Sequence, residues 1–261
     1  MTQEPFAAGS SLIHRLDPRF RIVLASAFSI AVAVSNHIPV LSAALAVSLV
    51  LTVMARLNAG EVLKRLRVVF WFLLLIWVVL PFTFEGKSLY RFGQFTITEP
   101  GVLLSIRITI KSTTILLALM SMISTMTIVT LGHALNLLHL PDKIVHLLLM
   151  THRYVFVIEE EYQRLLTAIK IRGFRSGTNI HSYRTYAYLI GMLFVRASIR
   201  AQRVHHAMLC RGFRGRFYTL ARFEPSARNW IFSILMAGVI AGLLVMEING
   251  YGDQWLWIKM A

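Results

Sequence analysis

Two short stretches of the sequence repeat the same four residues: arginine, glycine, phenylalanine and arginine. They read Ile171-Arg172-Gly173-Phe174-Arg175 and Cys210-Arg211-Gly212-Phe213-Arg214, and they lie 39 residues apart. Each stretch ends a segment with helical periodicity, where the helix dipole favours an arginine. The dipole does not require glycine and phenylalanine to follow, whereas an arginine fixed beside a ring suits a groove in another protein. The repeat therefore predicts two protein-docking sites.

A second group of residues has the types needed for metal chemistry. His152, Glu159 and Glu160 share one face of a predicted helix, which permits the hypothesis of metal-assisted hydrolysis. No His-Glu-x-x-His pattern accompanies them, and Arg164 lies four residues after Glu160, in the favourable order for a helical ion pair. Structural ion pairing is therefore the preferred interpretation, and we expect no metal site. A phosphate-binding Gly-x-x-x-x-Gly-Lys-Ser/Thr loop is also absent from the sequence, so any ATP-derived energy must come from a partner.

The composition indicates that the elements carrying these residues belong to an integral membrane protein. Of 261 residues, 56% are hydrophobic and only 15% are charged, against about 25% in soluble domains. Mean hydropathy is +0.64. The 27 basic and 12 acidic residues give a net charge of +15, but such hydrophobicity argues against both a soluble nucleic-acid binder and a disordered chain. A single cysteine excludes a disulfide framework and any multi-cysteine metal site.

The uncharged apolar runs predict about five transmembrane helices. The runs are Ile22–Ala55, Val68–Phe84, Ser112–Leu131 and Asn229–Met246. The first is too long for one crossing, since about 20 residues span a bilayer, and the sequence Asn36-His37-Ile38-Pro39 divides it into two short spans. Arg107 and Lys111 are expected to lie near the outer end of the fourth span and to extend outward to water. The predicted fold class is an all-α integral membrane protein with additional long cytoplasmic helices.

Basic residues set the expected orientation. With the N-terminus inside, 22 Lys and Arg residues fall in cytoplasmic segments and three in outer segments. This bias predicts a cytoplasmic N-terminus and an outer C-terminus. No signal peptide is apparent in the first 21 residues. The predicted domains are a four-span region at 1–131, a cytoplasmic region at 132–228, and a final transmembrane helix with an outer tail at 229–261.

The cytoplasmic region is predicted to contain two long helices that end at the repeated motifs. The first runs from about Pro141 to Arg172 and the second from about Ser182 to Arg211, with Gly173 and Gly212 in the position after each helix end. Basic residues of the second helix lie within an arc of about 80°, namely Arg196, Arg200, Arg203 and Arg211. This arc suits packing on a partner or contact with the anionic inner leaflet, and a solvated face is the simpler alternative.

Taken together, these features resemble the transmembrane (T) component of energy-coupling factor transporters, of the CbiQ type found in cobalt and nickel uptake. The resemblance covers nearly the whole chain. It includes His14-Arg15-Leu16-Asp17-Pro18-Arg19, the stretch Leu135-Asn136-Leu137-Leu138-His139-Leu140-Pro141, Arg153-Tyr154-Val155-Phe156 with Glu160, and the paired Arg-Gly motifs. The family's signatures are Ala-Arg-Gly triplets, so Ile171 and Cys210 stand where alanine is usual.

The resemblance implies a coupling role without catalysis. Ile171, Arg172, Gly173, Cys210, Arg211 and Gly212 would form the ATPase-coupling motifs, with Arg196, Arg200 and Arg203 as a supporting basic face. The implied partners are two ABC-type ATPases and a membrane substrate-binding (S) component, CbiM-like with a small CbiN-like subunit. This chain would bind no cofactor or metal itself: ATP and magnesium would bind the ATPases, and the transported cobalt or nickel ion would bind the S component. The implied location is the bacterial inner membrane.

Three alternatives follow from the same residues. For an importer of this type the expected cargo is cobalt. Nickel and a vitamin are alternatives, because the S component selects the cargo. A stand-alone metal-dependent membrane enzyme would use the face of His152, Glu159 and Glu160. An ordinary ABC permease would contact its ATPase through one short loop, and two long basic helices argue against it.

Overall fold

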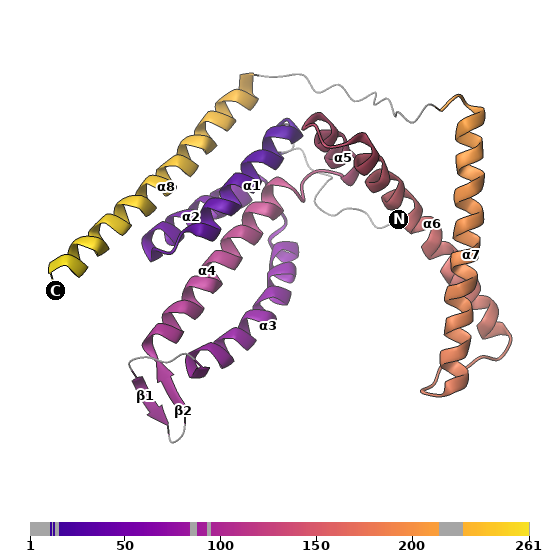
Figure 1. Ribbon diagram of the computed structural model, residues 1–261, viewed down its shortest axis with the longest axis horizontal. Helices are drawn as coiled ribbons and strands as arrows, with labels where there is room; N and C mark the ends of the chain where they lie inside the picture. Colours follow the sequence, from indigo (N-terminus) through magenta and orange to yellow (C-terminus); the bar gives the residue numbers. More distant parts are fainter. Residues whose placement is uncertain are drawn as a thin grey trace. The chain divides into compact units, whose positions relative to one another are not determined.

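The computed structural model describes residues 11, 13, 16–83, 88–92, 95–213 and 227–260. This part of the chain is almost entirely helical, with one antiparallel two-stranded hairpin in addition (Figure 1). The predicted all-α membrane fold class is confirmed, and the hairpin is an unpredicted addition. In chain order the elements are α1 (Pro18–Val34), α2 (Ile38–Met54), α3 (Ala59–Thr83), β1 (Ser88–Phe92), β2 (Phe95–Thr98), α4 (Glu99–Met122), α5 (Ile128–Leu137), α6 (Asp142–Ile171), α7 (Ile180–Cys210) and α8 (Ala227–Met260).

The chain divides into two compact units. The membrane unit consists of the described residues of Gln3–Leu131 and Phe223–Ala261, and the α6–α7 unit consists of those of Gly132–Arg222. In sequence, the α6–α7 unit is therefore an insertion between the first helices of the membrane unit and its last helix, α8.

Local sequence explains how the first two helices begin and end. Asp17 Oδ1 accepts a hydrogen bond from the backbone N–H of Arg19 at 3.0 Å, and Pro18 occupies the first turn of α1, where its missing N–H costs nothing. The chain then leaves the helix at Ser35 and enters α2 at Ile38, with Pro39 in the first turn. The break predicted at residues 36–39 is confirmed.

The core of the membrane unit is formed where α1, α2, α4 and α8 pack together. α4 packs along both α1 and α2, and α8 packs against the same two helices. The buried side chains at these contacts include Phe28, Leu41, Ala118, Met122 and Met236. Because these residues come from four helices, burial of their apolar surface holds together segments that are distant in sequence.

The fourth predicted span is wrong in its position. The prediction began at Ser112 and continued to Leu131, but α4 begins at Glu99 and ends at Met122, and α5 begins after a break at residues 123–127. The prediction began too late because it treated Arg107 and Lys111 as flanking charges, whereas both lie inside α4.

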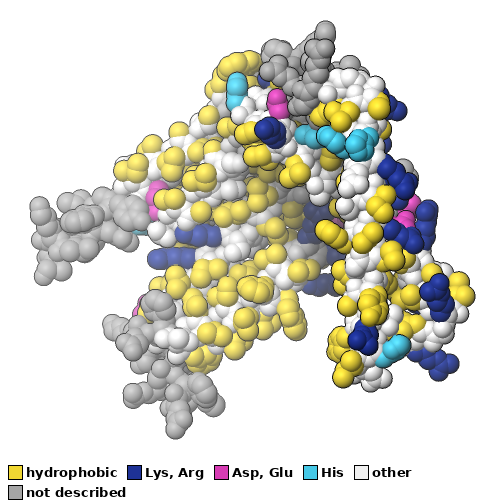
Figure 2. Space-filling view, turned by 45° about the vertical axis from the view of Figure 1, so that its right-hand side comes forward, with side chains coloured by type: hydrophobic (Ala, Val, Ile, Leu, Met, Phe, Trp, Pro, Cys, Tyr) yellow, Lys and Arg dark blue, Asp and Glu magenta, His cyan; other side chains and the backbone are white. Residues whose placement is uncertain are grey.

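Several helices have the length and apolarity of membrane spans. Three of the described helices qualify by length and composition, namely α3, α4 and the Asn229–Asn249 part of α8. Helix α2 is apolar but shorter, and both α1 and α2 have 17 residues, the lower end of the range of about 17–25. Large apolar side chains such as Trp71 and Phe72 on α3 are exposed, as expected of a surface that meets lipid. Figure 2 shows hydrophobic side chains over much of the visible surface, with Lys and Arg side chains spaced among them.

Candidate coupling site

The first Arg-Gly motif forms a defined helix end. Gly173 has a φ of +82°, the left-handed conformation that favours glycine, as predicted from its position after α6. Its N–H donates to the carbonyl of Lys170 at 3.0 Å, and the N–H of Phe174 donates to that of Ile169 at 3.2 Å. These two hydrogen bonds are the Schellman pattern, which satisfies carbonyls that the helix leaves without a partner.

The second motif repeats this geometry at the end of α7. Gly212 has a φ of +75°, and its N–H donates to the carbonyl of Leu209 at 2.9 Å. The N–H of Phe213 donates to the carbonyl of Met208 at 3.1 Å. The two motifs are therefore alike in structure as well as in sequence. In both, the glycine and the phenylalanine that follows it donate the two hydrogen bonds.

The arginines and the phenylalanines of these motifs have different surroundings. Arg172 and Arg211 are exposed, as are the preceding Ile171 and Cys210. The rings, in contrast, are partly buried within the α6–α7 unit.

Each ring packs on the unit's own side chains. Phe174 meets Tyr186 edge-on with ring centroids 5.7 Å apart and also lies beside His181. Phe213 lies 6.5 Å from His146. These contacts argue against the interpretation of the ring as a docking group for a partner. The rings stabilise the helix ends, and the arginines project from them. Arg214, the last residue of the repeat, lies outside the described residues, as do His14 and Arg15 of the N-terminal stretch.

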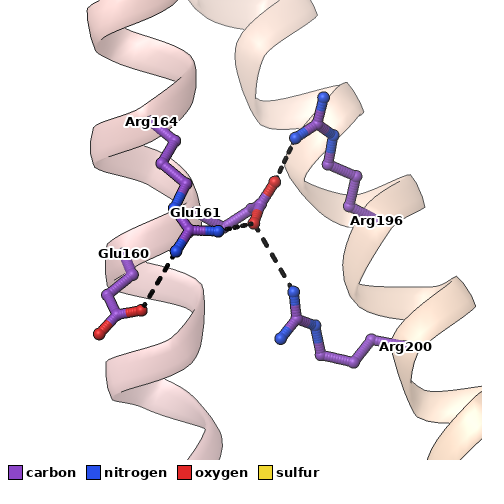
Figure 3. Close-up of polar contacts among 5 residues, drawn as sticks. All are labelled: Glu160, Glu161, Arg164, Arg196 and Arg200. Atoms are coloured by element: carbon purple, nitrogen blue, oxygen red, sulfur yellow. Dashed lines mark hydrogen bonds and ion pairs between the residues drawn. The ribbon is translucent and has the colours of Figure 1, made fainter.

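A single carboxylate joins the two long helices (Figure 3). Glu161 of α6 forms ion pairs with Arg196 and Arg200 of α7, the latter at 3.6 Å, and with Arg164 of its own helix at 3.9 Å. The Glu161 side chain is 13% exposed, against 47% for Arg196 and 45% for Arg200. The hydrogen bond from Arg196 lowers the pKa of Glu161, and the other two guanidiniums act in the same direction.

The predicted basic face therefore pairs with a carboxylate of the same chain, in addition to any partner molecule. Arg196 and Arg200 reach across to Glu161, and Arg203 lines the same groove. Glu161 was not singled out from the sequence. Its spacing to the α7 arginines is long-range, so only the fold brings them together.

The residues considered for metal chemistry do not gather into a metal site. Glu160 pairs with Arg164 at 3.8 Å, which confirms the predicted ion pair, and His152 packs edge-on against Phe156 at 5.3 Å. Among the residues that the structure describes, no group of three or more His, Cys, Asp or Glu side chains is arranged to hold a metal ion.

A polar cluster inside the membrane unit was not anticipated. Lys111 of α4 donates from Nζ to the carbonyl of Ala33 at 2.9 Å and to Asn36 Oδ1 at 3.1 Å. Glu247 of α8, which is 4% exposed, accepts the backbone N–H of Asn36 at 2.7 Å. Lys111 thus binds the end of α1 and Glu247 binds the start of α2, where the helix dipoles favour these charges. Lys111 was expected to extend outward from its helix; in the structure its ammonium reaches these groups at the end of α1.

Arg21 plays a similar part at the other end of α4. It is 2% exposed, donates from Nε to the carbonyl of Met122 at 2.9 Å, and also donates to Thr125 Oγ1. The sequence signal for this role was an arginine in the first turn of the first helix, directly beside the first apolar run. The N-terminal stretch is anchored as well, since the N–H of Asp17 donates to Asn229 Oδ1 at 3.3 Å.

Comparison with known proteins identifies similar chains in several microorganisms. The chain is 29% identical over 224 residues to the energy-coupling factor transporter transmembrane protein EcfT of Brevibacillus brevis, covering 80% of this chain and 83% of that one. It is 28% identical over 255 residues to the EcfT of Listeria innocua, covering 92% and 95%. It is also 23% identical to an uncharacterized protein of Methanocaldococcus jannaschii, over 95% of this chain and 86% of that one.

A family model described as CbiQ, cobalt transport protein, matches residues 9–219. This match includes helices α1 to α7 and both Arg-Gly motifs, so it extends over the membrane helices and the two long helices alike. On this match, together with the multi-helix membrane fold, the chain belongs to the CbiQ family.

Proposed function

We propose that this chain is the transmembrane coupling component of an ATP-driven energy-coupling factor importer, and that it transmits motion from partner ATPases to a separate substrate-binding subunit. The observation that carries the proposal is the pair of matching helix ends. Each presents an exposed arginine ahead of a left-handed glycine, on a rigid turn closed by two hydrogen bonds.

The geometry suits a docking function because it fixes where each arginine lies. The backbone of Arg172 and Arg211 is held at the cap position, and the following rings pack inside the unit. An arginine whose base is fixed loses less freedom on binding a carboxylate or carbonyl group of a partner. The proposed partners are two ABC-type ATPases at these motifs and a CbiM-like membrane S component, with a CbiN-like subunit.

The same role makes this chain a non-catalytic subunit. Its relatives are named as transporter transmembrane proteins, and ATP with magnesium would be bound by the ATPases. The proposed location is the bacterial inner membrane, with the N-terminus inside and the C-terminus outside, on the strength of the distribution of basic residues.

Cobalt is the proposed cargo, because the family description names cobalt transport. Nickel and a vitamin are the alternatives, since the separate subunit selects the substrate. Uptake of radiolabelled Co²⁺ by cells that contain the complete importer, with excess Ni²⁺ as competitor, distinguishes the first two.

The coupling role is tested by Arg172→Ala combined with Arg211→Ala in the complete importer. We expect substrate uptake to fall more than tenfold and the ATPases to be lost on affinity purification, because each arginine would be a central contact of its interface. The amount of the chain in the membrane should not change.

The matched control is Lys143→Ala combined with Arg184→Ala. It removes two exposed positive charges of α6 and α7 that are not part of the motifs, so uptake should be retained. Normal uptake by the Arg172/Arg211 variant would overturn the proposed role.

A further inference from the structure

The α6–α7 unit contains a groove lined by the supporting basic face, separate from the two Arg-Gly motifs. It has a volume of about 420 Å³ and is lined by Glu161 of α6 and by Arg196, Ile199, Arg200 and Arg203 of α7. The three arginines follow one another at spacings of four and three residues, so they line one side of α7.

The groove carries more positive than negative charge. Its single carboxylate, Glu161, is shared among Arg196, Arg200 and Arg164. Arg203 makes no ion pair with any other residue that the structure describes. The guanidiniums of Arg196, Arg200 and Arg203 outnumber the one carboxylate of the groove. Unused N–H donors and net positive charge therefore remain to bind an external anion.

An apolar stripe runs beside the arginines on the same helix. Tyr188, Met192, Val195 and Ile199 lie within an arc of about 60° that adjoins the arginine side of α7. All four are exposed, and Ile199 also lines the groove. A fully aqueous anion site would not need such a stripe, whereas a ligand with both an anionic group and hydrocarbon would contact both.

We propose that this groove binds the headgroup phosphate of an anionic phospholipid, with the acyl chains lying along the apolar stripe of α7. The guanidinium fork matches phosphate oxygens, and basic helices with an adjoining apolar face associate with anionic lipids. The chain is a membrane protein, so such lipids surround it. The proposal can be tested apart from the coupling motifs, because it uses neither Arg172 nor Arg211; it gives the supporting basic face a lipid as its ligand.

Native mass spectrometry of the full chain in a neutral detergent tests the proposal. Wild-type protein is titrated with dioleoyl phosphatidylglycerol and, separately, with dioleoyl phosphatidylcholine. We expect tight binding of the first lipid only. Arg203→Gln should weaken it about fivefold, the contribution expected of one basic residue near an anionic lipid. Because Glu161 pairs with Arg196 and Arg200 rather than with Arg203, this change leaves the contacts of Glu161 in place.

The combination of Arg196→Gln, Arg200→Gln and Arg203→Gln should abolish selective binding. Its matched control combines Lys143→Gln, Arg175→Gln and Arg184→Gln, which removes the same charge from exposed positions outside the groove and should bind the lipid normally. Equal binding by the control and the groove variants, or equal binding of both lipids by wild type, would overturn the proposal.

A competition with inorganic phosphate separates the two sources of the anionic group. If millimolar phosphate displaces phosphatidylglycerol completely, the groove is a site for free anions and the lipid assignment is wrong. If phosphate leaves the lipid bound, and Ile199→Asn weakens lipid binding, the apolar stripe contributes as proposed. Capture of a partner protein through Arg203 with no lipid effect would likewise overturn the assignment.

Discussion

At the scale of single residues, two glycines decide the geometry of the candidate coupling site. Gly173 and Gly212 both adopt the left-handed conformation, and a Cβ added at either would meet no atom within 4 Å. A substitution there would therefore cost backbone strain without a steric clash. Glycine is therefore favoured at these two positions by the backbone conformation and not by close packing.

Gly173→Ala and Gly212→Ala should each destabilise the helix end by about 1 kcal/mol, the cost of a left-handed L-residue. Gly191→Ala is the matched control, because Gly191 lies within α7 in open space and alanine is the better helix former. In thermal unfolding of the purified chain, the melting temperature should fall for the two motif variants and rise for Gly191→Ala. Unchanged stability of both motif variants would mean that the turns relax to another conformation.

The sequence was informative about residues whose role is local. The positions of Gly173 and Gly212 after helical segments were enough to predict their role as helix ends. The partners of Lys111 and the role of Glu247 were not predicted, because these contacts join different parts of the chain: Lys111 binds at Ala33 and Asn36, and Glu247 also binds at Asn36. No spacing along the chain indicates such contacts.

At the scale of elements, one ionic contact ties α6 to α7. Within the part of the chain that the structure describes, the ion pairs between these helices all involve Glu161. Its neighbour Glu160 pairs along α6, with Arg164. Two adjacent glutamates thus serve different purposes, because successive residues of a helix point about 100° apart.

Glu161→Gln should loosen the α6–α7 pairing, whereas Glu160→Gln should leave it unchanged. Spin labels at exposed Ala168 and Ser198, in a Cys210→Ala background, would report this by pulsed electron paramagnetic resonance as a broader distance distribution for Glu161→Gln alone. The folded-state pKa of Glu161 lies below its ordinary value, so its contribution is present at neutral pH. It is lost as the pH falls below the ordinary value of 4.5 and through the lower folded-state pKa.

Wild-type protein should therefore show the same broadening in acid, and Glu161→Gln should show no further change there. A wild-type distribution that is equally narrow at neutral pH and well below the folded-state pKa would contradict this role.

The helices themselves were largely predictable, and the exceptions have physical reasons. The turn between α1 and α2 carried a polar pair and a proline, and it was found. The break between α4 and α5 was not, because residues 123–127 are apolar or hydroxyl-bearing and include no glycine or proline. There the interruption is stabilised by tertiary contacts, with Arg21 bound to Met122 and Thr125.

At the scale of the whole molecule, the membrane unit is assembled from two ends of the chain with the α6–α7 unit inserted between them. Charged side chains fix that assembly at three helix ends: Arg21 at the end of α4, Lys111 at the end of α1, and Glu247 at the start of α2. Each charge binds a backbone group at a helix end that has no partner within its own helix. Glu247 also attracts Lys111 electrostatically. Asn36 binds both residues, since its backbone N–H donates to Glu247 and its Oδ1 accepts from Lys111.

This arrangement makes the two opposite charges depend on each other. Lys111→Met and Glu247→Gln should each lower the free energy of unfolding by about 2 kcal/mol, because each removes a charged hydrogen-bonding group. The double variant should lose less than the sum, since a single substitution leaves the other charge in the membrane unit without its counterpart. Chemical unfolding in detergent measures all three, with Lys64→Met as the control for loss of an exposed lysine. A double variant whose loss equals the sum would show that the two helix ends are stabilised separately and that α8 is held in place by its apolar contacts.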